Sequence, residues 1–296
     1  MIPYVRDMEF EYGKVDKLTP LIRRVICNNP GPFTFKGTGT YIIGKGEGLA
    51  VIDPGPDDDA HLRAILDATW GEPITHILIT HHHMDHSPLA RPLAAKTGAV
   101  IYGCAVKSVA VDDGVRTEAG ADNFRPDVPV CDGATIEGNG WTMEAIPTPG
   151  HTSNHICYAL KEENALFSGD HIMGWSTTVV TPPDGNMADY LASLDLIKAR
   201  NFTTLWPTHG PPITAPGPFI DAYRAHRLDR ERQILAQLQA GETKIVEMVP
   251  KMYVGVDTRL YPAAARSVHA HMIELVRTGR AVTDGAAELG AAYRPA

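Results

Sequence analysis

Long apolar runs are missing from this sequence. No stretch approaches the roughly 18 to 20 consecutive apolar residues that a membrane-spanning helix needs, and the N-terminal segment reaches Arg6 and Asp7 without the apolar region of a signal peptide. We therefore expect no membrane contact and predict a cytoplasmic location. The composition, 44% hydrophobic and 21% charged, is that of an ordinary folded protein.

Cysteine is scarce as well. The chain has four cysteines, and no two of them have the C-x-x-C spacing typical of a thiolate zinc site. Neither such a site nor a disulfide framework is indicated, so we interpret the four as buried reduced thiols. They are Cys27, Cys104, Cys131 and Cys157.

Positively charged residues are also scarce in the first part of the chain. Residues 1–217 carry 16 Lys and Arg against 26 Asp and Glu, a balance of −10, whereas residues 218–296 carry 11 against 9, a balance of +2. Nucleic-acid affinity comes chiefly from neutralising phosphates with Lys and Arg. The acidic first part therefore excludes a broad polyanion-binding surface, although a local basic groove remains open.

Short β-rich runs fill the first two thirds of the chain, and most are bounded by Gly, Pro, Asp or Asn, as strands are. They cover 40–43, 49–52, 76–79, 99–102, 142–146, 155–160 and 165–167. Helical patterns lie between some of them, at 59–70, 88–97 and 187–199. Ser87 is the expected N-cap of the middle helix, with Gly98 at its exit. The pattern predicts a mixed α+β domain.

Near Pro218 the sequence pattern changes from short strand-like runs to long helical patterns. Helical patterns are expected from Phe219 to Gly241, Thr243 to Tyr253 and Pro262 to Thr278, followed by a small hairpin around Asp284-Gly285. Three helices and a hairpin are typical of a winged helix. We place the boundary in the Pro/Gly-rich stretch before it, which divides the chain into a first domain at 1–217 and a winged-helix-like domain at 218–296.

The run Thr80 to His86 carries the clearest chemistry. His81 and His83 directly follow an apolar strand, and residues two apart in an extended segment point to the same side, so both imidazoles can face one metal ion. Asp85 and His86 lie where the chain turns toward the next helix and could serve a second ion. His82 points the other way and is not expected to be a ligand.

Three further candidates follow strand-like runs on short Gly/Pro loops: His151, Asp170 and His209. Five histidines and two carboxylates suffice for two divalent ions. We assign His81, His83 and His151 to the first ion, and Asp85, His86 and His209 to the second. Asp170 bridges them, because a carboxylate can give one oxygen to each of two cations. Imidazole and carboxylate ligands suit zinc best, with iron or manganese as alternatives.

The segment from Thr80 to His86 resembles the H-x-H-x-D-H signature of the metallo-β-lactamase superfamily, and His151, Asp170 and His209 match its later metal motifs in order. Asp53, in Asp53-Pro54-Gly55, resembles a family position that supports the site from outside the metal ligands; an ordinary turn explains it equally well. The resemblance covers residues 20–215 and implies an αββα sandwich with the metals at one edge.

The C-terminal part is similar to the β-lactamase-like protein 2 group, whose members end in a winged-helix-like domain beside the active-site cleft. Two departures from other branches are informative. Where true metallo-β-lactamases commonly have a cysteine ligand, this chain has Asp170. The interval from Asp170 to His209 has no room for the inserted domain of the β-CASP nucleases.

The motifs predict a zinc-dependent hydrolase in which a metal-bridging hydroxide attacks a small ester, thioester or lactone. Asp85 and Asp170 are the catalytic carboxylates, and Asp85 could orient the nucleophile. His155 is a candidate proton donor, although a structural hydrogen bond explains it better. Trp175 could line the substrate pocket.

Two alternatives remain open. Single-stranded RNA cleavage, an activity that the resembling group includes, could use Arg224, Arg227, Arg230 and Arg232; Arg227 is also a candidate for the substrate pocket. A DNA-binding regulator with a metal-bound sensor domain could use the winged helix, through Arg266, His269, His271 and Arg277. The small net charge of this part argues against that reading. Oligomeric state is not indicated.

Overall fold

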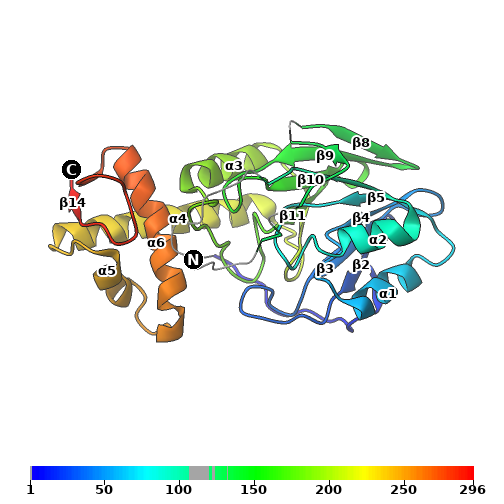
Figure 1. The fold of residues 1–296 in the computed structure, drawn as a ribbon, viewed down its shortest axis with the longest axis horizontal. Coiled ribbons are helices and arrows are strands. Elements are labelled where there is room, and N and C mark those ends of the chain that lie inside the picture. The colour runs from blue at the N-terminus through cyan, green and yellow to red at the C-terminus, as the bar shows by residue number, and fades with distance from the viewer. Residues whose placement is uncertain (1, 107–119, 122–123, 132) are drawn as a thin grey trace.

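Two facing β-sheets form the centre of the larger part of the molecule, on the right in Figure 1. The computed structural model describes residues 2–106, 120–121, 124–131 and 133–296. Within these residues, the first sheet runs in the order β1 to β7 and the second in the order β12, β11, β10, β9, β8. The first comprises β1 (Val15–Lys17), β2 (Ile22–Ile26), β3 (Gly39–Ile43), β4 (Leu49–Ile52), β5 (Ile74–Leu78), β6 (Val100–Gly103) and β7 (Val128–Pro129). The second comprises β8 (Thr135–Gly138), β9 (Trp141–Pro147), β10 (Ile156–Leu160), β11 (Ala165–Gly169) and β12 (Thr204–Pro207).

Helices cover the outer face of each sheet. Side chains such as Tyr41, Phe167 and Trp206 fill the space between the sheets. On the far side of the first sheet pack α1 (Asp59–Ala68) and α2 (Ala90–Thr97), and on the far side of the second pack α3 (Met187–Ala199) and the start of α4 (Pro216–Gln239). Central strands are buried on both faces because each has a helix layer on one side and a sheet on the other. The predicted αββα sandwich is confirmed.

The C-terminal part has a core of its own. The second half of α4 packs with α5 (Ile245–Met252), α6 (Tyr261–Arg277) and the strand pair β13 (Ala281–Thr283) and β14 (Tyr293–Pro295). Two short 3₁₀ turns are also present: η1 (Lys161–Glu163) between β10 and β11, and η2 (Thr258–Leu260) between α5 and α6. The predicted winged-helix arrangement of three helices followed by a strand pair is therefore present. No helix in the described part of the chain is long and apolar enough to span a membrane.

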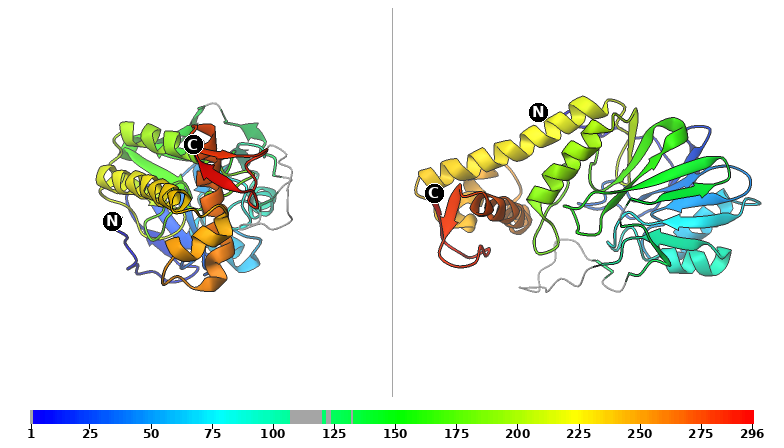
Figure 2. Two further views of the ribbon diagram at one scale, coloured as in Figure 1. Left: turned by 90° about the vertical axis from the view of Figure 1, so that its left-hand side faces the viewer. Right: turned by 90° about the horizontal axis from the view of Figure 1, so that it is seen from above.

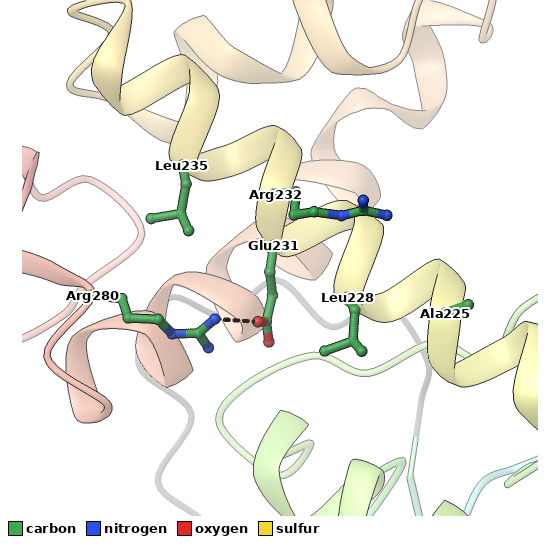
Figure 3. Close-up of a pocket in the computed structure, with 6 residues that line it drawn as sticks. All are labelled: Ala225, Leu228, Glu231, Arg232, Leu235 and Arg280. Carbon is green, nitrogen blue, oxygen red and sulfur yellow. Dashed lines mark ion pairs between the residues drawn. The ribbon is translucent and has the colours of Figure 1, made fainter.

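The helix α4 belongs to both cores. Phe219 and Tyr223 pack in the core beside the second sheet, and Ile234 and Leu238 pack in the C-terminal core. Figure 3 shows the side of α4 that faces Arg280, where Leu228 and Leu235 line a pocket and Glu231 pairs with Arg280 at 2.8 Å. The division at 217/218 stays a prediction, since this continuous helix starts at Pro216 and crosses the junction (Figure 2).

Two local predictions are wrong. Ser87 does not cap α2: its hydroxyl donates to the carbonyls of His82 and His83, and the helix begins at Ala90. Cys104 and Cys131 form a disulfide, whereas Cys27 and Cys157 are the buried free thiols that were expected. The parallel strands β6 and β7 end just before these two cysteines, and this adjacency brings the sulfurs together across 27 positions of sequence.

Candidate metal centre

The candidate ligands meet at one edge of the sandwich. His81 and His83 follow β5, His151 follows β9, Asp170 follows β11 and His209 follows β12. Because β11 and β12 are parallel neighbours, the residues after them emerge side by side. The strands thus present ligands from separate parts of the sequence at a single place, and all five side chains are buried.

One group of nitrogens is formed by His81, His83 and His151. The Nδ1 atom of His83 lies 3.0 Å from Nε2 of His81 and 3.2 Å from Nε2 of His151. The opposite nitrogen of His151 faces the carbonyl oxygen of Val179 at 2.6 Å, so Nδ1 carries the proton and Nε2 presents a lone pair. His81 is fixed likewise, with Nδ1 3.0 Å from the Thr80 hydroxyl. Lone pairs that converge in this way suit a cation.

A second group consists of Asp85, His86 and His209. Oδ2 of Asp85 lies 3.1 Å from Nε2 of His209 and 3.6 Å from Nε2 of His86. The Nδ1 atoms of these two histidines face Asp53 and the carbonyl of Gly37, at 2.8 and 3.2 Å, so both Nε2 atoms turn into the site. The Asp85 side chain is 25% exposed, which makes it the carboxylate of the site that reaches solvent.

Asp170 lies between the two groups. Its Oδ1 is 3.5 Å from Nε2 of both His86 and His209, whereas its Oδ2 is 3.9 Å from Nε2 of His151. Each carboxylate oxygen thus faces a different group. Within the described residues, Oδ1 of Asp170 and Nε2 of His86 are buried without a hydrogen-bond partner. Buried polar atoms are rarely left so, and a bound cation would satisfy both, so the donor set fits metal ions.

The pKa shifts divide the site in the same way. Burial and neighbouring imidazoles hold the pKa of His81 and His83 well below its usual value, so both rings are neutral at pH 7. For His86, burial lowers the pKa, but the Asp85 and Asp170 carboxylates outweigh it and raise the pKa. Against the raising effect of burial, the nearby histidines lower the pKa of Asp170. A bound cation would take the place of the proton that His86 holds beside these carboxylates.

Asp53 and His155 support the site from behind. Asp53 is fully buried and accepts from His86 Nδ1, from the Thr80 amide and hydroxyl, and from the Thr208 hydroxyl, at 2.7 to 3.0 Å. His155 accepts the amide N–H of Asp170 with Nε2 at 3.2 Å, while its Nδ1 lies 2.9 Å from the Thr148 hydroxyl. Both nitrogens of His155 are thus occupied, and Nε2 holds the backbone of Asp170. The structural reading of His155 fits this geometry better than proton donation.

Among the remaining predictions, His82 points away from the group and bonds Asn154 at 2.9 Å. Trp175 is half-buried beside Gly210, and its ring stacks on Phe35 with centroids 4.9 Å apart. Sequence reasoning missed Phe35, which gave no signal beyond its place in a Pro/Gly-rich loop.

Arg227 differs from its expected place in an open pocket. Its side chain is 2% exposed, donates to the carbonyl of Thr178 and covers the ring of Tyr190 at 5.0 Å. This placement corrects the expectation, because a buried guanidinium that is packed on a ring does not face solvent.

Comparison with known proteins agrees with this geometry. Residues 34–209 match the Metallo-beta-lactamase superfamily, and residues 245–289 match the Beta-lactamase associated winged helix domain. A Beta-lactamase-like protein 2 homolog of Caenorhabditis elegans is 34% identical over 88% of this chain and 84% of its own length. An atrochrysone carboxyl ACP thioesterase of Cryptosporiopsis is 31% identical over 76% of this chain and 65% of its own.

Solved structures share the fold. A crystal structure of a beta-lactamase domain protein from Burkholderia ambifaria superimposes with a TM-score of 0.78 at 20% identity, covering 98% of this chain and 96% of that protein. The similarity therefore extends through both the sandwich and the C-terminal part.

Proposed function

Because the chain belongs to the metallo-beta-lactamase superfamily, we propose that it is a hydrolase that holds two divalent metal ions, with zinc preferred, and cleaves a small ester-like substrate, a thioester foremost. The observation that carries the proposal is the position of Asp170. Its two oxygens face two separate groups of buried ligands, which is the arrangement of a carboxylate shared by two cations. Iron and manganese are the alternatives to zinc.

Such ions supply hydroxide at neutral pH and polarise the oxygen of the scissile carbonyl. The protein's own residues supply the rest. Asp85 is the partly exposed carboxylate of the site and would accept a hydrogen bond from an attacking water, which fixes the direction of approach. Asp53 keeps His86 in the tautomer that presents Nε2 to the site.

The leaving group favours a thioester. His155, the side chain that the sequence offers as a proton donor, already accepts the amide of Asp170. Protonation of the leaving group is then left to solvent, and a thiol with a pKa of roughly 8.5 leaves as thiolate far more easily than an alkoxide does. The acyl-carrier-protein thioesterase among the relatives supports the same substrate class.

RNA cleavage remains the second candidate within catalysis, and the arginines of α4 give it little support. Arg224 pairs with Asp195 at 2.9 Å, Arg232 pairs with Asp229 at 2.9 Å, and Arg230 covers the Tyr253 ring at 4.2 Å. These contacts use the charges that a phosphate backbone would need. The regulator alternative is weakened similarly, since Arg266 and His271 on α6 are buried. A small-molecule substrate and a cytoplasmic location stay part of the proposal.

The test combines metal counting with turnover. The purified protein would be assayed on short acyl thioesters, a lactone panel and labelled single-stranded RNA. We expect two ions per chain and thioester cleavage. For Asp170→Asn we expect loss of at least one ion and a roughly 1,000-fold loss of kcat, the upper end of the roughly 100- to 1,000-fold range for one lost electrostatic group. Asp195→Asn, on the exposed surface, is the matched control and should behave as the wild type.

Two outcomes would contradict the proposal. Full activity with two ions in Asp170→Asn would remove Asp170 from the site. RNA cutting without turnover of any ester would reverse the order of substrates.

A further inference from the structure

Two buried side chains of α4 hold the backbone of the loop that follows Asp170. The hydroxyl of Tyr223, which is fully buried, accepts the amide of Met173 at 3.1 Å and contacts the carbonyls of Met173 and Ser176. One helical turn further on, Arg227 donates to the carbonyl of Thr178. Both contacts are to the backbone of the loop, so they fix its path whatever its side chains are.

The position of Arg227 is costly. Its side chain is 2% exposed, and no acidic side chain of the described residues pairs with it. Burying a guanidinium without a carboxylate costs free energy, which hydrogen bonds and a ring face repay only in part. The Tyr190 ring lies 5.0 Å away, and the Tyr190 hydroxyl donates to the carbonyl of His171, the residue after Asp170. The Arg227 guanidinium is therefore one of the groups that support the loop.

The loop in turn holds His151. Val179, which follows Thr178, offers its carbonyl oxygen to Nδ1 of His151 at 2.6 Å. Further along, Asp184 accepts the amide of Ser153, so the loop holds the turn after His151 as well. Consecutive carbonyls thus receive Arg227 on one side and His151 on the other. A change at Arg227 would move the peptide that orients the His151 ring.

We propose that Arg227 and Tyr223 are positioning residues for His151, through which the helix shared with the C-terminal part sets the metal affinity of the group His81, His83 and His151. The inference rests on the proposed metal-dependent function. Partners that orient a metal-binding histidine typically change metal affinity by roughly 10- to 100-fold when they are removed. His86 and His209 have other supports, Asp53 and Gly37, so the group that they form with Asp85 should be spared.

The experiment is a cobalt titration of the metal-free full chain, followed by absorbance. Wild type should bind two ions. Arg227→Met should weaken one of them by at least 10-fold and leave the other within 3-fold, and Tyr223→Phe should act in the same direction with a smaller effect. Arg227→Lys keeps a donor for the Thr178 carbonyl and should recover part of the lost affinity.

Arg224→Met is the matched control. Arg224 lies on the same helix in an exposed pair with Asp195, so both affinities should stay as in the wild type. If Arg227→Met does not fold, Tyr223→Phe, which removes only a hydroxyl, carries the test.

The results separate the two proposals. A wild type that binds no ion would refute the proposed function. A wild type that binds two, with folded variants that bind both as tightly, would refute the positioning role alone. An equal weakening of both ions that Arg227→Lys fails to reverse would also refute it, because that pattern indicates general destabilisation.

Discussion

The buried carboxylate of Asp53 accepts several hydrogen bonds next to the candidate metal ligands. Four donors converge on its two oxygens. The Thr80 amide bonds Oδ1, and Nδ1 of His86 and the hydroxyls of Thr80 and Thr208 bond Oδ2. The residues that it joins directly precede or belong to the candidate metal ligands, and they come from the ends of two strands, β5 and β12. Asp53 therefore determines both the tautomer of His86 and the spacing of the loops.

Asp53→Asn should break this arrangement. An amide has two donors where the carboxylate has only acceptors, so at least one of the four donors loses its partner and meets another N–H. We expect a loss of about 2 to 4 kcal/mol in the free energy of unfolding and a roughly 10- to 100-fold weaker metal affinity. Urea denaturation and metal titration measure the two effects.

Asp221→Asn is the control for that substitution, since Asp221 pairs with Lys198 on the exposed surface. Wild-type metal affinity in Asp53→Asn would show that the carboxylate does not orient His86.

His61 gives the protein a pH dependence of stability. It is buried and donates through Nε2 to Thr40, whose hydroxyl proton goes to the carbonyl of Asp53, so Nδ1 carries the lone pair. Burial lowers the pKa of His61 to about 4. The unfolded chain takes up the proton near pH 6.5, so between pH 6.5 and 4 it binds more protons than the folded chain. Stability should therefore fall as the pH drops through this window and level off below it.

His61→Gln, which keeps a donor for Thr40 but cannot titrate, should remove that part of the dependence. The interval from 6.5 to about 4 corresponds to roughly 3 kcal/mol. The measurement is the difference in unfolding free energy between the two proteins at pH 4, 5, 6 and 7, in which the shared metal ligands cancel. A difference that does not change with pH would contradict the assignment.

At the scale of elements, the site depends on a close approach between the β9–β10 loop and α3. Gly150 has φ of 138°, and a Cβ placed there would lie 2.4 Å from Cα and 2.5 Å from N of Tyr190. Its carbonyl accepts the amide of Asn186, the residue that caps α3. The next residue is His151. The contact that packs the loop on α3 therefore also fixes the position of a candidate metal ligand.

Gly150→Ala should force the loop off α3 because the clash is with backbone, which cannot move aside cheaply. Overpacking of this kind costs roughly 1 to 3 kcal/mol, and we expect the upper end of that range with weaker binding of one metal ion. Thermal unfolding and cobalt titration are the measurements. Gly217→Ala, in the first turn of α4 with nothing within 4 Å of its Cβ, should be neutral or slightly stabilising.

Elements with clear start and stop signals could be predicted from the sequence. The helix 187–199 was predicted from its helical pattern with the bounds that the structure has, and the structure shows Asn186 as its N-cap. The strand β2 was missed, since Arg23 and Arg24 interrupt its apolar run, and Arg24 is buried through a pair with Asp16. Strands β1, β7 and β8 are too short and polar to show a period.

The candidate site was more predictable than its surroundings. Ligand types and strand-end positions are visible in the sequence. Of the three groups of close ligand atoms among the described residues, two have the members of the predicted sets, and their metal binding stays a prediction. Asp53 and His155 could be anticipated as supports, whereas the roles of Arg227, Thr178 and Phe35 could not, because they arise from packing between distant segments. The disulfide was hidden for the same reason: it depends on the adjacency of β6 and β7.

At the scale of the whole molecule, α4 makes the sandwich and the C-terminal part depend on each other. The helix has 24 residues, which corresponds to roughly 36 Å, and its two ends are buried in different cores. A chain that stops at residue 217 therefore lacks not only the winged helix but also part of the sandwich core, namely Phe219, Ile220 and Tyr223.

Truncation tests this dependence. A fragment 1–217 should be poorly soluble or strongly destabilised, because each lost apolar side chain is worth roughly 2 kcal/mol. A fragment 1–240 keeps these side chains and exposes Ile234 and Leu238 instead. We expect the longer fragment to have a Tm at least several degrees higher in thermal unfolding. Equal Tm values would show that the sandwich core does not need α4.

The bond between Cys104 and Cys131 gives the polypeptide two covalent forms that differ by two hydrogen atoms. Denatured without reductant, the oxidised form should take up two equivalents of an alkylating reagent, at Cys27 and Cys157, and the reduced form four. Intact mass spectrometry distinguishes them, and four equivalents from air-oxidised protein would contradict the pairing. Because disulfides persist in oxidising compartments and are reduced in most cytosols, the alkylation count of protein taken directly from cells records the environment in which the chain resides.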